Sequence, residues 1–169
     1  MKKVSIPLLF ILFFCAGFVK TVSAQWKDYT WESYGIDFKA PTNLTLKQND
    51  HKAFTASNAI FTMSIKPWKD ASVTDPVEIC QKAMDITPGT DKTVIKEVSI
   101  PNLHGLKAYE AYCTAIQTRK LMHMVIGGYL DPSNSTNFTV QLLFWDGDEA
   151  ANDQNYKAAL YILKSFRAE

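Results

Sequence analysis

The chain has 169 residues, of which 47% are hydrophobic, and its 18 basic and 17 acidic residues leave a formal net charge of +1. This length suits one domain with a sizeable buried core. The near-neutral charge argues against a nucleic-acid partner, because proteins that bind DNA or RNA carry a basic patch or stripe.

The first 24 residues have the three parts of a secretory signal. Two lysines follow the initiator methionine, an uncharged run rich in Leu and Phe extends over 6–19, and small residues end the segment at Ala24. The run is shorter than the roughly 20 apolar residues that a bilayer-spanning helix needs. We therefore expect cleavage before Gln25 and a secreted or periplasmic domain, 25–169, with no integral membrane segment. The compact Lys-Lys start favours a bacterial protein. With the three leader lysines removed, 15 basic and 17 acidic residues give a mature charge of −2.

The mature sequence begins with an aromatic and polar segment, 25–34, and continues with short strands. The alternating run 35–40 ends at a proline, as a strand often does. A second short strand is expected at 44–48. The segments 52–56 and 60–66 lie on either side of a Ser-Asn pair and predict a hairpin.

The clearest helix start lies in the middle of the chain. Asp75 is placed to cap the helix, and Pro76 suits its first position. The apolar residues Val77, Cys80 and Met84 follow at helical spacing. A Pro-Gly pair then ends the helix.

Four longer strands and a second helix complete the chain. We expect the strands at 93–100, 106–117, 120–130 and 137–145. The helix is expected at 149–166. Its apolar stripe consists of Tyr156, Ala159, Leu163 and Phe166. One helix in the middle of a series of strands and one at the end indicate an α+β fold, a mostly antiparallel sheet with both helices packed on it.

The segment 34–41 resembles the strand that opens PsbP-like and DcrB-like domains, in which a glycine, a phenylalanine and a proline have the same spacing. The match continues in order with the capped mid-chain helix, Gly105 before long strands, and a closing helix that ends with 162–166. The resemblance covers nearly all of the mature chain and implies a PsbP-like fold. Members of this group are accessory and binding proteins with unrelated roles, so the fold implies no single function. The chain departs from the pattern after the proline, where Asn43 and Leu44 replace an aromatic residue.

The usual catalytic and metal-binding motifs do not occur in the sequence. It contains no Gly-x-Ser-x-Gly elbow and no phosphate-binding glycine loop. The three histidines lack a second His or Cys at metal-ligand spacing. The acidic segment 146–149 lacks the register of a calcium loop, and helix capping explains its acids. We therefore expect no cofactor and no metal.

The alternation of side chains along the strands predicts a mixed polar and aromatic sheet face. If Thr118 and Arg119 form a two-residue loop, Thr114 lies opposite His123, and Tyr112 shares their face. We expect the apolar residues of the last strand on the other face, with the apolar residues of its neighbours. The candidate ligand-binding face then consists of Glu110, Tyr112, Thr114, His123, Tyr129, Gln141 and Trp145. Such side chains suit a shallow binding surface, and they are equally typical of a half-solvated sheet face.

Two cysteines remain after the leader is removed. The predicted register directs Cys113 toward the helix face that bears Cys80. In an oxidising compartment such a pair forms a disulfide, whereas two buried thiols pack as small apolar residues. The sequence leaves both alternatives open.

Three functions remain compatible with these features. The first, which the sequence favours, is a non-enzymatic binding or accessory domain whose partner is a small molecule or an envelope protein. The second is a small secreted hydrolase that uses Glu110 and His123 with a tyrosine. The predicted register separates these two residues by roughly 13 Å, too far to act on one substrate. The third is an assembly role through an exposed sheet edge.

Overall fold

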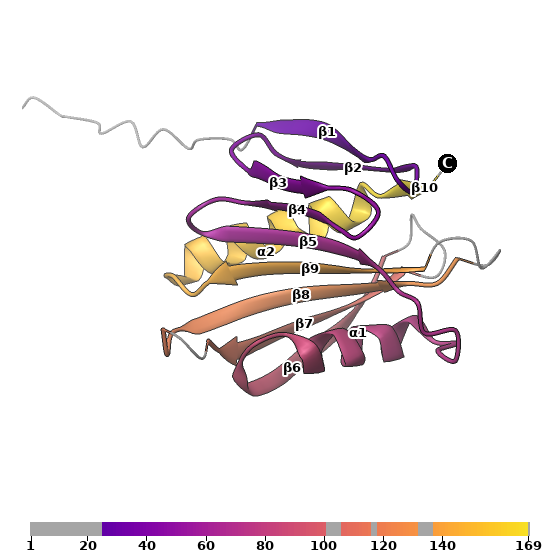
Figure 1. The fold of residues 1–169 in the computed structure, drawn as a ribbon. Helices are drawn as coiled ribbons and strands as arrows, with labels where there is room; N and C mark the ends of the chain where they lie inside the picture. Colours follow the sequence, from indigo (N-terminus) through magenta and orange to yellow (C-terminus); the bar gives the residue numbers. More distant parts are fainter. Residues whose placement is uncertain (1–24, 101–105, 116–117, 132–136, 169) are drawn as a thin grey trace, which may run out of the picture.

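The computed structural model describes residues 25–100, 106–115, 118–131 and 137–168 (Figure 1). The predicted secretory signal lies outside these residues. Within the described ranges, neither helix is long and apolar enough to cross a membrane.

The described chain forms two antiparallel sheets and two helices. The elements are β1 (Trp26–Trp31), β2 (Ile36–Pro41), β3 (Thr45–Asn49), β4 (Phe54–Ser57), β5 (Phe61–Pro67), α1 (Pro76–Ile86), β6 (Thr90–Ser99), β7 (Leu106–Thr114), β8 (Leu121–Tyr129), β9 (Phe138–Trp145), α2 (Glu149–Lys164) and β10 (Arg167–Ala168). The larger sheet has the strand order β3-β4-β5-β9-β8-β7-β6, and the smaller has the order β1-β2-β10. This architecture confirms the predicted α+β class.

Both helices begin at the predicted caps. The Asp75 carboxylate accepts a hydrogen bond from the Val77 N–H at 2.8 Å, and Pro76 is the first residue of α1. The Asp148 carboxylate accepts one from the Ala151 N–H at 2.8 Å, at the start of α2. Each cap supplies an acceptor to a backbone donor that the helix itself leaves without a partner.

The turn between β7 and β8 is longer than the predicted two-residue loop. Arg119 adopts φ 56°, and its N–H donates to the Ala115 carbonyl at 2.8 Å. A two-residue hairpin loop needs positive φ angles that strain a β-branched threonine, and the longer turn avoids this strain. Tyr112, instead of Thr114, therefore lies opposite His123. The predicted register is wrong by two residues, a shift that keeps every side chain on its predicted face.

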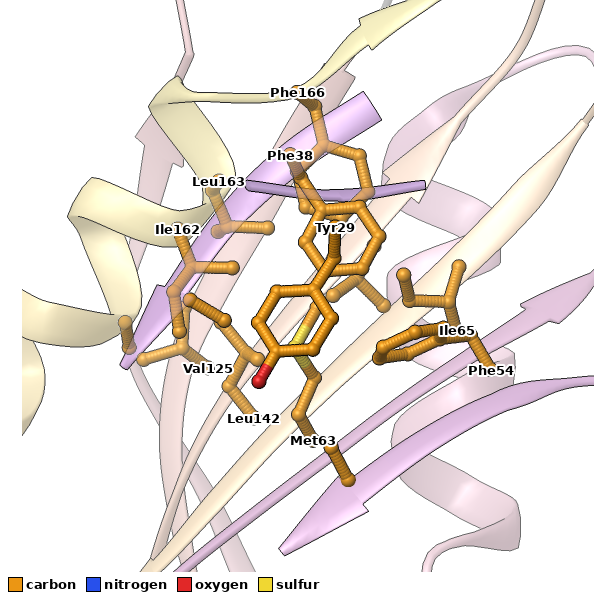
Figure 2. Packing of buried hydrophobic residues seen from close by; sticks show 14 of the residues in the cluster. Tyr29, Phe38, Phe54, Met63, Ile65, Val125, Leu142, Ile162, Leu163 and Phe166 are labelled. Atoms are coloured by element: carbon orange, nitrogen blue, oxygen red, sulfur yellow. The ribbon is translucent and has the colours of Figure 1, made fainter. Parts of the chain in front are cut away.

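The larger sheet has an apolar core on each face, and the two helices cover opposite faces (Figure 1). The first core joins one face to the smaller sheet and α2. It includes Tyr29, Phe38, Phe54, Met63, Val125, Leu142, Ile162, Leu163 and Phe166 (Figure 2). The second core lies under α1. It consists of Cys80, Ala83, Met84, Ala111, Cys113, Met122, Met124 and Ile126, which includes most of the predicted apolar face of β7 and β8.

The side chains of β9 face the opposite way from the prediction. Leu142 lies opposite Val125 and Gln141 opposite Ile126. The fully apolar set of β9 therefore belongs to the first core, not to the core under α1. The prediction failed because it assumed one apolar and one open face, whereas helices cover the central strands on both faces.

The aromatic segment at the start of the domain contains a strand that the sequence did not indicate. Within β1, Tyr29 and Trp31 point inward and are buried. β1 pairs with β2 along its whole length, Trp26 opposite Pro41. The small sheet thus places Trp26 at its end, where the described chain begins.

Candidate functional site

The seven candidate residues do not form one surface. The five on β7 and β8 share one face by register, as predicted. Gln141 and Trp145 lie on the opposite face, because the register between β8 and β9 directs their side chains away from the His123 side of the sheet. The expected single binding face is therefore wrong.

The face that carries the five candidates of β7 and β8 belongs largely to the first core. Tyr129 is buried there against Phe138, with ring centroids 4.8 Å apart. Burial raises the pKa of the Tyr129 hydroxyl. The side chains of Glu110 and Tyr112 lie outside the described part of the structure. Most of the described part of this face therefore packs against other elements.

Gln141 stabilises the end of α1. Its Nε2 donates to the Ala83 carbonyl at 3.2 Å and to the Thr87 hydroxyl at 3.1 Å. Helix C-termini leave carbonyls without intrahelical donors, and a side-chain amide satisfies one of them. Gln141 is therefore a structural residue. Trp145 is 36% exposed at the end of β9.

His123 lies at the edge of the first core, where the sheet face opens into a hollow of about 540 Å³. We call this the His123 hollow. Its described lining consists of Ile95, Lys96, His123, Met124, Phe144, Glu149, Asn152, Asp153 and Tyr156. The hollow thus lies between the β6 edge and the first two turns of α2.

The His123 ring is fixed on both sides. It stacks on Phe144 with centroids 5.3 Å apart and an interplanar angle of 9°. Its Nε2 lies 2.8 Å from Asp146 Oδ1, which also accepts from the Asn152 amide at 2.9 Å. The His123 hydrogen bond, and then that of Asn152, hold the pKa of the Asp146 carboxyl below its usual value.

An ionised carboxylate only accepts hydrogen bonds, so Asp146 selects the His123 tautomer with the proton on Nε2. Nδ1 is then the basic atom of the neutral ring. A nucleophilic mechanism needs a hydroxyl or thiol within hydrogen-bond reach of that base. The described lining of the hollow contains no serine, threonine or cysteine.

The corrected register brings Glu110 closer to His123 than predicted. Glu110 lies opposite Val125, two residues from His123, and Tyr112 lies directly opposite His123. Diagonal neighbours of this kind are about 7–8 Å apart at their backbones. The two residues are therefore closer than the predicted register implied, and the predicted separation no longer argues against an acid–base pair.

A second hollow, which sequence reasoning missed, lies between α2 and the end of the small sheet. We call it the Trp26–Tyr161 groove, and its volume is about 570 Å³. Its lining consists of Trp26, Pro41, Asn43, Leu44, Asn58, Ile60, Phe61, Gln154, Asn155, Lys157, Ala158 and Tyr161. Trp26 and Tyr161 are in contact, with ring centroids 4.4 Å apart. Tyr161 is an aromatic residue of α2 outside its apolar stripe. This position is the one sequence signal that could have pointed to the groove.

The two cysteines lie where the predicted faces put them. Cys80 on α1 and Cys113 on β7 are both buried, and both belong to the second core. Burial raises the pKa of the Cys113 thiol, which makes the thiolate, the reactive form, less accessible. Both cysteines are free thiols in this structure, and the disulfide stays a prediction.

Within the described ranges, no three His, Cys, Asp or Glu side chains gather as a metal site. The acids of the segment 146–149 have helix and hydrogen-bond roles. Asp146 binds His123 and Asn152, and Asp148 caps α2.

No protein-family model and no curated protein matches the chain. The Ran-binding protein Mog1p of Saccharomyces cerevisiae is similar in structure, with a TM-score of 0.66 and 10% identity over 86% of this chain and 96% of Mog1p. A Mog1 point mutant gives a TM-score of 0.63 and 10% identity over 85% and 96%. LpqN of Mycobacterium tuberculosis, described as involved in cell envelope biogenesis, gives 0.43 and 16% identity over 85% and 90%. The chain thus has the Mog1/PsbP-like fold, the fold class that the resemblance implied.

Proposed function

We propose that this chain is an exported, non-enzymatic binding or accessory domain that holds its ligand in the Trp26–Tyr161 groove. The groove itself is the observation that carries the proposal. Ligand sites are concave, largely apolar and supplied with a few polar groups, with volumes of about 300–1,000 Å³. The groove has this size and this mixture of side chains.

The positions of the lining residues support a preformed site. The floor includes Leu44 and Phe61, which are buried and therefore held by the first core. One wall is a face of α2, with Ala158 and Tyr161. Rigid elements that fix a cavity in advance lower the ordering cost of binding.

Export is the part of the proposal that the leader supports. The charged start, the short apolar run and the small residues before Gln25 follow the pattern of a cleaved signal. We further propose that the domain is a distant member of the PsbP-like and DcrB-like group and acts in the periplasm or outside the cell. Expression of the full chain in a bacterial host and intact-mass analysis test this. We expect a chain that starts at Gln25 in the exported fraction, and an uncleaved cytosolic product overturns export.

A protein partner is compatible with the same role. Mog1p is described as a Ran-binding protein, although an identity of 10% carries only the fold to this chain. An envelope protein that inserts a side chain into the groove would use the same lining residues as a small ligand.

Thermal-shift screening of the exported protein tests the binding role. The panel contains small metabolites, peptides and envelope extracts, and each hit is repeated with Tyr161→Ala. Trp145→Ala is the matched control, because Trp145 and Tyr161 are both aromatic and are 36% and 44% exposed. We expect hits that Tyr161→Ala weakens and Trp145→Ala leaves unchanged. A panel without such a hit overturns the assignment of the groove.

The corrected β7–β8 register favours a second candidate, the secreted hydrolase. It would use the base Nδ1 of His123 with Tyr112, which lies opposite it on the neighbouring strand, and Glu110, which lies at a diagonal position. A panel of ester, amide and glycoside substrates tests it, with His123→Gln as the variant. Hydrolysis that this variant abolishes supports the hydrolase, and absence of turnover on every substrate excludes it for those bond types.

A further inference from the structure

The chemistry of the Trp26–Tyr161 groove narrows the class of ligand. Besides its aromatic and apolar residues, the groove has four amide side chains and one charged side chain. The amides belong to Asn43, Asn58, Gln154 and Asn155. The charged group is the Lys157 ammonium.

Three of the amides keep their full hydrogen-bonding capacity. No described residue bonds to the side chains of Asn43, Gln154 or Asn155. Asn58 uses its oxygen to accept from the N–H groups of Ile60 at 2.9 Å and Phe61 at 2.8 Å, which leaves its NH₂ group for a ligand. An amide offers donors and acceptors side by side. This combination matches a hydroxyl group, which also donates and accepts.

The single charged side chain of the lining has its counter-ion within the protein. The Lys157 ammonium lies 2.6 Å from the Asp153 carboxylate, one turn earlier on α2. This pairing offsets part of the positive charge that the groove offers to an anionic ligand, and the described lining contains no acidic side chain that would attract a cation. The groove therefore selects for neutral ligands.

The two rings form a wall that suits a flat, partly apolar ligand. Trp26 and Tyr161 contact each other at an interplanar angle of 54°, and Tyr161 remains 44% exposed. Aromatic rings provide a large contact area at low cost in conformational entropy. A pyranose ring has C–H groups on its faces and hydroxyl groups around its edge, so it can contact the rings and the amides together.

We propose that the Trp26–Tyr161 groove binds one or two sugar residues of a neutral oligosaccharide. This inference rests on the proposed function, since it names the ligand class of the same groove. The hydroxyl groups would bond to Asn43, Gln154 and Asn155, and the C–H face would pack on Trp26 and Tyr161.

Titration of the exported protein with maltose, cellobiose and N,N′-diacetylchitobiose, together with an array of neutral glycans, tests the ligand class. Binding is followed by tryptophan fluorescence and by amide shifts in two-dimensional NMR spectra. We expect saturable binding of a neutral glycan and shifts around Tyr161 and Asn155. We expect Tyr161→Ala and Asn155→Ala to weaken binding by about tenfold each, and Trp145→Ala to leave it unchanged. Both groove positions are on the surface of α2, where alanine favours the helix.

The remaining outcomes separate this inference from the proposed function. Binding of peptides or of uronic-acid sugars that Tyr161→Ala abolishes, without any neutral glycan, overturns the sugar assignment and keeps the binding role. Glycan binding that Tyr161→Ala and Asn155→Ala leave unchanged overturns the groove as its site. If no ligand is found whose binding depends on Tyr161, both the sugar assignment and the proposed binding role of the groove are overturned.

Discussion

Tyr29 and Trp31 lie two positions apart on β1, and both are buried in the first core. Trp31 Nε1 donates a hydrogen bond to the Asp50 carbonyl at 2.7 Å. The Tyr29 hydroxyl points into the core and has no partner among the described residues (Figure 2). A buried polar group without a partner costs about 1–3 kcal/mol. We therefore expect Tyr29→Phe to raise the free energy of unfolding by about 1 kcal/mol, and Trp31→Phe to lower it by about 2 kcal/mol.

Urea denaturation of both variants measures these changes. The two substitutions share a strand and a core, and each removes one polar group from an aromatic side chain. If β1 were sensitive to any substitution of a buried aromatic residue, the free energy of unfolding would fall in both variants. A loss of stability in Tyr29→Phe contradicts the expected cost of its hydroxyl.

Asp70 connects the β5–α1 segment to α1 through a charged hydrogen bond. The Ser72 hydroxyl, and then the Lys82 ammonium at 3.0 Å, lower the pKa of the Asp70 carboxyl from 3.8 to about 2. Because the pKa is lower in the folded state, the contribution to stability is complete above the unfolded value. It is lost as the pH falls through the folded value. We expect the stability difference between wild type and Asp70→Asn to narrow as the pH falls from about 4 to about 2.

Urea denaturation across this pH range measures the difference. Ser72→Ala keeps the carboxylate but removes the strongest cause of the lowered pKa, so its stability is expected to fall between those of the other two proteins at neutral pH. A difference between wild type and Asp70→Asn that is independent of pH contradicts the linkage.

At the scale of the elements, local chemistry made both helices predictable. Asp75 and Pro76 mark the start of α1 through capping and a preset φ angle, and these effects act within a few residues. The long strands were predictable from alternation for the same reason. Strand β1 was missed because four aromatic residues among polar ones gave no clear period.

Pairing between strands was only partly predictable. The faces of β7 and β8 follow from their own alternation, so a shift of two residues left them unchanged. The face of β9 depends on which apolar sets meet across the sheet. Both cores are apolar, so the pattern of Phe138, Val140 and Leu142 fits either side. The Trp26–Tyr161 groove was beyond prediction, because its residues come from four segments that contact only in the folded chain.

The close contact of α1 with β8 predicts a strong effect at one glycine. A Cβ atom on Gly128 would lie 2.3 Å from the Pro76 carbonyl oxygen and 2.8 Å from Ile79 Cβ. The helix must move to admit it, and such overpacking costs about 1–3 kcal/mol. We expect Gly128→Ala to lower the free energy of unfolding by this amount in urea denaturation.

Gly147→Ala is the control for this substitution. Its Cβ would lie 3.2 Å from Ala151 Cβ, a contact that a small shift of the chain relieves. We expect a clearly smaller loss there. Equal losses in the two variants would show that the contact with α1 does not determine the effect, because the change in backbone entropy on Gly→Ala favours the folded state at both positions.

For the whole molecule, the central feature is one sheet with two separate cores. Strand β8 contributes to both, Val125 to the first and Met124 to the second. Each helix covers a single face. The core residues of α2 belong to the first core and those of α1 to the second. The sheet is therefore the element through which the two halves stabilise each other.

This arrangement predicts a single unfolding transition even when only one core is damaged. Leu142 and Met124 are fully buried in different cores, and truncation of such side chains to alanine costs about 2–5 kcal/mol. We expect Leu142→Ala and Met124→Ala each to lower stability by an amount in this range, with the same dependence on urea as wild type. Far-ultraviolet circular dichroism reports the sheet and helices, and labelling of Cys113 in the reduced protein reports the second core. The two probes should give the same midpoint in every variant, because loss of either core removes support from β8 and β9. If Met124→Ala exposes Cys113 at a lower urea concentration than the one that unfolds the sheet, the α1 face opens independently and the cores are not coupled.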